Sequence, residues 1–74
     1  STIYDVVIAN INRNILLDEI AEYAVRLASG GHLLLSGFYA EDIPFLTQAA
    51  QPLGLVLEAE TNLRNWACLR LRKN

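Results

Sequence analysis

The most constraining feature of the sequence is an apolar stretch that passes directly into a polar side chain and then into a helical pattern. Residues 3–8 predict a strand, and Val6-Val7-Ile8 is continuously apolar instead of alternating. A continuous run is typical of a strand covered on both faces, as in a parallel sheet flanked by helices. Asn10 follows this strand almost at once. The pattern therefore predicts an α/β fold with a polar group at the end of a buried strand.

A helix is predicted next, with Asn14 as its N-cap and with Asp18 and Glu19 near its start, where the helix dipole favours negative charge. Its buried stripe at helical spacing consists of Leu16, Ile20, Tyr23, Ala24 and Leu27. We expect Ser29-Gly30-Gly31 to end this helix, because glycine readily takes the left-handed conformation of a C-cap.

A second short strand is predicted at residues 32–36, so the chain opens with a parallel β-α-β unit. A second helix follows, with Asp42 as its cap and Pro44 within its first turn, where proline is tolerated. Pro52 and Gly54 are expected to close this helix. Its apolar face consists of Ile43, Leu46, Ala50 and Leu53.

The last part of the chain predicts two strands joined by a short turn. Residues 55–60 form the third strand, residues 61–65 the turn and residues 66–72 the fourth strand. Strands joined by so short a loop must be antiparallel. The predicted order is therefore β-α-β-α-β-β with a closing antiparallel hairpin, in a single domain over residues 1–74.

Composition excludes several classes of protein. The chain is 53% hydrophobic and 19% charged, which argues against disorder, and its net charge of -2 does not favour nucleic acid. Arg64, Arg70, Arg72 and Lys73 are interpreted as a solvated face and tail, because an RNA-binding patch needs aromatic or glycine partners. The single Cys68 excludes an internal disulfide and suits a reducing cytoplasm. No stretch predicts a signal peptide or a membrane span.

Ligands of open α/β sheets bind beyond the carboxyl ends of the parallel strands. Two such ends are predicted, at residues 10–12 and 36–39, and neighbouring strands bring them to one rim. Asn10 offers an amide donor and a carbonyl acceptor, Ser36 a hydroxyl, and Gly37 room for close approach. The alternative interpretation is structural: Asn10 shapes the turn, and Ser36 and Gly37 pack where the two chain segments cross.

The remaining polar and aromatic residues give weaker signals. His32 has no neighbouring Ser, Cys or carboxylate and is expected to cap a strand entrance, while Cys68 is expected to pack. Metal-ligand spacing is absent. Trp66, Phe38 and Tyr39 are expected to pack in the core or at the rim, with stacking on a substrate as the alternative.

Three segments together resemble a known family. They are Asp5-Val6-Val7-Ile8-Ala9-Asn10-Ile11, Gly30-Gly31-His32-Leu33-Leu34-Leu35-Ser36-Gly37 and Asn65-Trp66-Ala67. They resemble the C-terminal half of the bacterial ribosomal protein L11 methyltransferases, which use S-adenosylmethionine to methylate amino groups of a large-subunit protein. The likeness runs across nearly all 74 residues in order. Residues 10–17 with 36–39 look like the version found in the Bacteroides group.

The resemblance implies the C-terminal half of a Rossmann-like class I methyltransferase sheet. Strands in that class are ordered three, two, one, four, five, seven, six, with the seventh antiparallel. The four strands of this chain would be four, five, six and seven. The fourth strand of the chain is then expected between its second and third.

The resemblance also implies roles for residues at the rim. Asn10 is similar to the first Asn of the Asn-Pro-Pro-aromatic motif of other amine methyltransferases, with Ile11-Asn12 in place of the two prolines. Its carbonyl would accept a hydrogen bond from the target amine and orient the nitrogen lone pair. Ile11, Ser36, Gly37 and Phe38 are the implied substrate rim. No base for deprotonating the amine is evident.

The half of the family that holds the cofactor has no counterpart in the chain. The glycine-rich loop and the acidic residue for the ribose hydroxyls are missing, so the isolated chain is expected to bind no S-adenosylmethionine and to be inactive. The parent enzyme would act on a ribosomal protein in the cytoplasm. Self-association through the open edge of the first strand is expected. The alternative is a free-standing, non-enzymatic interaction domain derived from a methyltransferase half-sheet.

Overall fold

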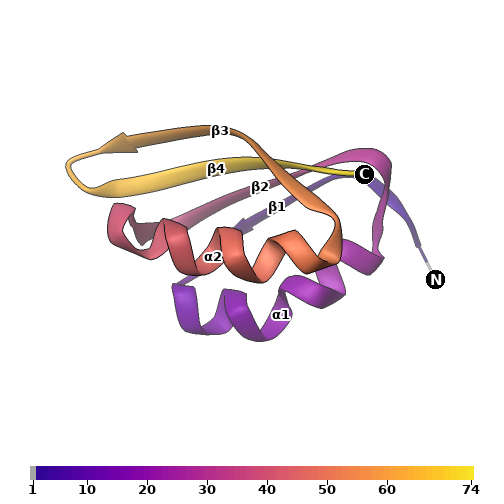
Figure 1. Cartoon of the computed structure of the whole chain (residues 1–74), viewed down its shortest axis with the longest axis horizontal. Helices are drawn as coiled ribbons and strands as arrows, with labels where there is room; N and C mark the ends of the chain where they lie inside the picture. The colour runs from indigo at the N-terminus through magenta and orange to yellow at the C-terminus, as the bar shows by residue number, and fades with distance from the viewer. Residues whose placement is uncertain (1) are drawn as a thin grey trace.

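The structure, a computed structural model, describes residues 2–74 and contains the predicted order of strands and helices. A short 3-10 helix precedes the second α-helix and another follows it (Figure 1). The elements are β1 (Tyr4–Asn10), α1 (Arg13–Val25), β2 (Leu27–Tyr39), η1 (Ala40–Asp42), α2 (Ile43–Ala50), η2 (Gln51–Leu53), β3 (Leu55–Leu63) and β4 (Trp66–Lys73).

The four strands form one mixed sheet in the order β1-β2-β4-β3. Strands β1 and β2 are parallel, whereas β4 is antiparallel to both β2 and β3. This confirms the parallel unit, the closing hairpin and the position of the last strand between the second and third. The turn is shorter than expected, because pairing continues to Leu63 opposite Trp66. Arg64 and Asn65 both have positive φ, the conformation of a two-residue turn that matches strand twist.

Both α-helices cover the same face of the sheet (Figure 1). The core lies between them and the sheet, and its strand residues alternate with half-buried neighbours in β2 and with exposed neighbours in β4. The largest fully buried side chains are Phe38, Leu16, Leu27, Leu33, Leu35, Leu46 and Leu71. The opposite face is open, so Val6 is 50% and Ile8 73% exposed. The expectation that the first strand is covered on both faces is therefore wrong for this chain.

Helix α1 begins two residues earlier than the sequence pattern predicted. Its N-cap is Asn12, whose Oδ1 accepts a hydrogen bond from the Ile15 backbone N–H at 3.0 Å, and Asn14 lies inside the first turn. Asn caps helices well at either position, and the path of the chain at the rim places Asn12 at the start of the helix. The first turn consequently contains no acidic residue, so Asp18 and Glu19 do not act on the helix dipole there.

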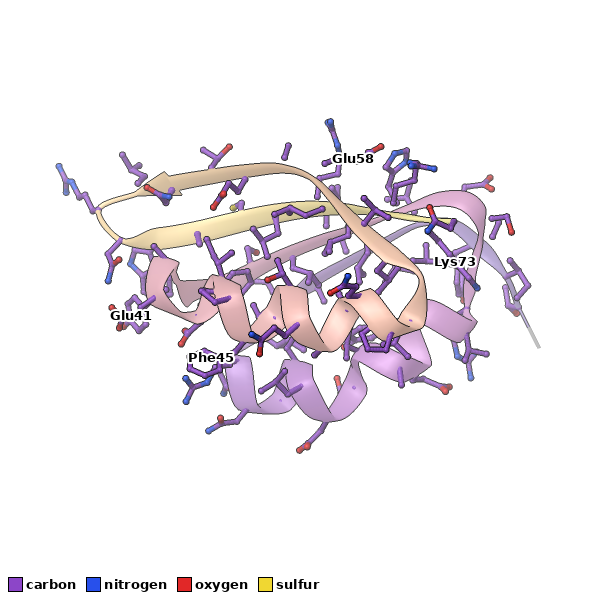
Figure 2. All side chains as sticks on the ribbon, in the orientation of Figure 1. Glu41, Phe45, Glu58 and Lys73 are labelled. Carbon is purple, nitrogen blue, oxygen red and sulfur yellow. The ribbon has the colours of Figure 1, made fainter. Side chains whose placement is uncertain are left out.

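The glycines at residues 30 and 31 lie inside β2 and do not end α1, which stops at Val25. The register of β1 against β2 shifts between Tyr4 and Val6, so the glycines belong to an irregular strand. A Cβ on Gly31 would lie 2.9 Å from the Asp5 carbonyl oxygen. The C-terminal end of α1 is instead stabilised by Lys73, in the last strand. Lys73 Nζ donates hydrogen bonds to the carbonyl oxygens of Ala24 at 2.6 Å and Leu27 at 2.9 Å (Figure 2).

Helix α2 follows η1 without a side-chain cap of its own. Asp42 is the N-cap residue of α2, as predicted, but its side chain does not cap this helix, because Asp42 Oδ2 accepts a hydrogen bond from the Tyr39 backbone N–H at 3.0 Å. Asp42 Oδ1 pairs with Arg13 at 3.1 Å, which ties the start of α1 to the end of β2. Pro44 lies in the first turn of α2, as predicted. These contacts fix the positions of α1 and η1, which follow β1 and β2 at the rim where the candidate site lies.

Candidate functional site

The two parallel strand ends meet at one rim of the sheet, as the sequence predicted. Asn10 and Ser36 are register partners on β1 and β2. The Ser36 hydroxyl donates a hydrogen bond to Asn10 Oδ1 over 3.2 Å, and the Ile11 backbone N–H donates to the Ser36 carbonyl oxygen over 3.0 Å. One side-chain and one backbone hydrogen bond therefore join the two ends.

Gly37 is required by this junction. Its φ is +96°, a conformation that residues with side chains rarely adopt. A Cβ at this position would lie 2.7 Å from Asn10 Oδ1 and 2.8 Å from both the backbone nitrogen and the carbonyl oxygen of Ile11. The space that the missing side chain leaves is filled by the Asn10 carboxamide and the following backbone. Gly37 thus sets how closely the two strand ends approach.

An open hollow of about 470 Å³ lies at the rim. It is lined by Asn10, Ile11, Asn12, Ser36, Gly37, Trp66, Ala67 and Cys68. Three of the four residues that the resemblance placed at a substrate rim, Ile11, Ser36 and Gly37, therefore border it together with Asn10. Phe38 does not contribute its side chain, because that ring is 1% exposed and belongs to the core.

Trp66 was expected to pack in the core or at the rim, and it lies at the rim, where it borders this hollow and packs against Tyr39. Trp66 is opposite Tyr39 in the β2–β4 register, and their ring centroids lie 4.8 Å apart at an interplanar angle of 31°. The two side chains remain 53% and 45% exposed. Sequence reasoning missed this pair because residues 39 and 66 become neighbours only when the last strand inserts beside the second. Trp66 thus gives the hollow an aromatic side chain, and Tyr39 packs against it.

The open face of the sheet carries an ion cluster centred on Glu58 (Figure 2). Its Oε1 lies 3.1 Å from His32 Nε2 and 3.5 Å from Arg70 Nε, and Arg72 Nε donates to Oε2 at 2.9 Å. Desolvation raises the pKa of the Glu58 carboxyl. The hydrogen bond from Arg72 and the positive charges of His32, Arg72 and Arg70 outweigh that effect and hold the pKa below its ordinary value.

Three minor expectations from the sequence concern His32, the basic residues of the last strand, and Cys68. His32 does not cap a strand entrance, because it lies within β2 and contacts Glu58. Arg70 and Arg72 pair with the same carboxylate on the open face, in agreement with a solvated strand face. Cys68 is exposed and borders the hollow, so it is not a core residue.

Two further features follow from the described part of the chain. Among residues 2–74, no group of three or more His, Cys, Asp or Glu is arranged to hold a metal ion. None of the helices described within those residues has the length and apolar character needed to cross a membrane. The residues that line the rim hollow carry amide, hydroxyl, thiol and aromatic groups.

Two solved structures of methyltransferases share this fold. The ribosomal protein L11 methylase of Lactobacillus delbrueckii subsp. bulgaricus superimposes with a TM-score of 0.91 and 27% identity, over 100% of this chain and 39% of that chain. A methyltransferase from Pyrococcus furiosus has a TM-score of 0.78 at 17% identity, over 100% of this chain and 43% of that one, and shows the fold alone. The chain has the fold of the C-terminal half of a Rossmann-like class I methyltransferase sheet.

The sequence comparisons identify the family within this class. The family model of ribosomal protein L11 methyltransferase (PrmA) matches residues 1–74. The ribosomal protein L11 methyltransferase of Porphyromonas gingivalis is 60% identical over 67 residues, or 90% of this chain and 23% of that protein. Its namesake in Phocaeicola vulgatus is 43% identical over 90% of this chain and 24% of that protein. The chain belongs to the ribosomal protein L11 methyltransferase family and spans about a quarter of the length of these relatives.

Proposed function

We propose that this chain provides the amine-binding side of the active site in an S-adenosylmethionine-dependent protein methyltransferase that acts on amino groups of ribosomal protein L11. The observation that carries the proposal is the position of Asn10. Its carboxamide lies at the carboxyl end of β1, borders the open hollow, and is tied to β2 through Ser36. The proposed substrate is the one for which the relatives are named.

The chemistry of Asn10 suits the holding of an amine. Its Oδ1 can accept two hydrogen bonds, of which Ser36 uses one. A neutral amine that donates to the second lone pair has its own lone pair directed away from the carboxamide, toward a methyl group presented from the far side. Such orientation of two reactants supplies a large part of the rate in group transfer. Asn10 is therefore the catalytic residue of this proposal.

The amine must be neutral to attack, and the hollow has no obvious base. The residues that line it include neither a carboxylate nor an imidazole. The amine therefore loses its proton before it reaches Asn10, or with the help of groups that other parts of a longer protein supply. Because the ammonium form has no lone pair, we expect the rate of transfer to rise with pH through the pKa of the bound amine.

The residues of this chain do not make a complete site for S-adenosylmethionine. The hollow provides no carboxylate that would bind the ribose hydroxyls, and the chain contains no glycine-rich strand-turn-helix. We therefore propose that the longer enzyme binds the methyl donor mainly through residues outside this chain. The isolated chain is inactive in this proposal, and the enzyme works in the cytoplasm, which agrees with a single free cysteine.

Two measurements test this proposal. Calorimetric titration of the 74-residue chain with S-adenosylmethionine should show no saturable heat, and micromolar affinity would contradict the assignment of the cofactor to other parts of the protein. A longer enzyme that carries this chain should transfer radiolabelled methyl groups to purified ribosomal protein L11. Absence of transfer, with the methyl donor demonstrably bound, would contradict the proposed substrate.

The second candidate function is a non-enzymatic interaction domain, and the exposed edge strand favours it. Strand β1 is at the edge of the sheet and exposes Val6 and Ile8. Unpaired edge strands readily pair with another chain, here a second copy. Sedimentation of the chain tests this, since a dimer that Val6→Lys dissociates would support it. The upstream coding sequence separates the candidates: an in-frame glycine-rich strand-turn-helix supports the enzyme, and a start codon directly before Ser1 supports the interaction domain.

A further inference from the structure

We propose that Ser36 is a positioning residue for methyl transfer, which it serves by fixing the orientation of the Asn10 carboxamide. This inference rests on the proposed function of Asn10. The Ser36 hydroxyl donates to Asn10 Oδ1 over 3.2 Å, and this is the only side-chain hydrogen bond that Asn10 makes within residues 2–74. The orientation of the carboxamide thus depends on one donor.

The backbone around the pair is fixed by separate contacts. Asn10 and Ser36 are register partners in the parallel ladder, and the Ile11 N–H donates to the Ser36 carbonyl oxygen over 3.0 Å. Gly37 packs against the same residues, since a Cβ there would lie 2.7 Å from Asn10 Oδ1. These contacts set where the Asn10 side chain begins. Among residues 2–74, Ser36 is the only side chain that hydrogen-bonds the carboxamide itself.

The orientation of the carboxamide decides the chemistry, because the two ends of a carboxamide have opposite hydrogen-bonding character. The oxygen accepts, whereas the NH₂ group only donates. A neutral amine with its lone pair aimed at the methyl group must donate to an acceptor, so a flipped carboxamide would turn the wrong group toward it. In the structure the Ser36 hydroxyl donates to Oδ1, which fixes the plane of the carboxamide at the rim and leaves the second lone pair of Oδ1 for the amine.

Ser36 also has the space to be tested by substitution. It is partly exposed and borders both the rim hollow and a second hollow of about 340 Å³ on the open face of the sheet. Ser36→Ala removes the hydroxyl without crowding the junction. Ser36→Thr keeps the hydroxyl and adds one methyl group, which the two hollows can accommodate. The pair of variants separates loss of the donor from a change of shape.

The test uses a longer enzyme that carries this chain, with ribosomal protein L11 as acceptor and radiolabelled S-adenosylmethionine as donor. Ser36→Ala should lower kcat by about tenfold, on the scale of one orienting hydrogen bond, with little change in KM for the acceptor. Ser36→Thr should restore most of the rate. If Ser36→Ala keeps the wild-type kcat while Asn10→Ala is impaired, the positioning role is overturned and the proposed function stands.

A double substitution distinguishes positioning from a structural contribution. If Ser36 acts through Asn10, then Ser36→Ala added to Asn10→Ala should cause no further loss of kcat, because the group that it orients is already gone. Independent, multiplicative losses would overturn the inference. If Asn10→Ala itself retains full activity, the proposed function of Asn10 fails, and with it the role of Ser36.

Discussion

The two faces of the sheet differ, because the helices cover one of them and leave the other open (Figure 1). On the face that the helices cover, Leu33, Leu35, Leu69 and Leu71 are at most 2% exposed. On the other face, Ile8 is 73% exposed and Glu58 gathers charged partners in solvent. A single continuous core on one side is enough to order four strands. The sequence of β1 is continuously apolar over residues 6–8, as in a strand covered on both faces. Because the helices cover only one face, β1 exposes Ile8 on the other (Figure 1).

Truncation of one aliphatic side chain on each face tests the difference between the faces most strongly. Leu33→Ala should lower the free energy of unfolding by about 2–5 kcal/mol, because the side chain is fully buried and leaves a cavity. Ile8→Ala should change it by no more than about 0.5 kcal/mol, because that side chain is mostly in water. Urea denaturation of the 74-residue chain gives both values. Equal losses for the two variants would mean that the open face is covered in solution.

The second prediction compares the rim with a free turn. Gly37→Ala should cost about 2–4 kcal/mol, since it combines a strained φ with a Cβ that collides with Asn10 and Ile11. Gly54→Ala is the matched control, because Gly54 has a φ of +77° but nothing within 4 Å of its Cβ position. It should cost only about 1–2 kcal/mol, the strain of the left-handed conformation. Thermal unfolding of both variants would contradict the close junction at the rim if the losses were the same.

The smallest effect is expected on the open face, where Glu58 pairs with exposed cations. Its pKa is held below the ordinary value of 4.5, so the folded chain binds a proton there less readily than the unfolded chain. The stabilisation is present above that ordinary value and is lost as pH falls through the lowered pKa. In Glu58→Gln the free energy of unfolding should therefore fall less steeply as the pH is lowered. The change in this slope should correspond to a fraction of one bound proton.

Urea denaturation at a series of pH values below 6 measures this slope for the wild type, Glu58→Gln and Glu60→Gln. Glu60 makes no ion pair among residues 2–74 and serves as the control. The difference between Glu58→Gln and wild type should shrink in 1 M salt, because exposed ion pairs are screened. An unchanged slope in Glu58→Gln would show that the cluster does not couple to folding.

Much of the architecture was predictable from the sequence because it depends on local patterns. The apolar runs indicated the strands, and the short loop before Trp66 required an antiparallel hairpin. The meeting of Asn10 and Ser36 followed from the geometry of parallel strands. The resemblance added the insertion of the last strand beside the second, which no local pattern in the chain indicates.

The remaining features depend on contacts between distant segments. Asn12 and Asn14 are equally good caps by type, and only the path of the chain at the rim selects Asn12. The glycines at residues 30 and 31 look like a helix stop, yet they lie in β2, and Gly31 packs against Asp5. The Tyr39–Trp66 pair arises from strand order, and Ile8 is exposed because both helices cover the other face of the sheet (Figure 1).

The account depends most on Asn10, and the most direct measurement is the rate of methyl transfer by a longer enzyme in which Asn10 is replaced by Ala. We predict a fall in kcat of about a hundredfold, the cost of losing the orientation of the amine, with unchanged binding of S-adenosylmethionine. Asn14→Ala is the control, since Asn14 lies in α1 and does not line the hollow. A wild-type kcat for Asn10→Ala would contradict the central claim.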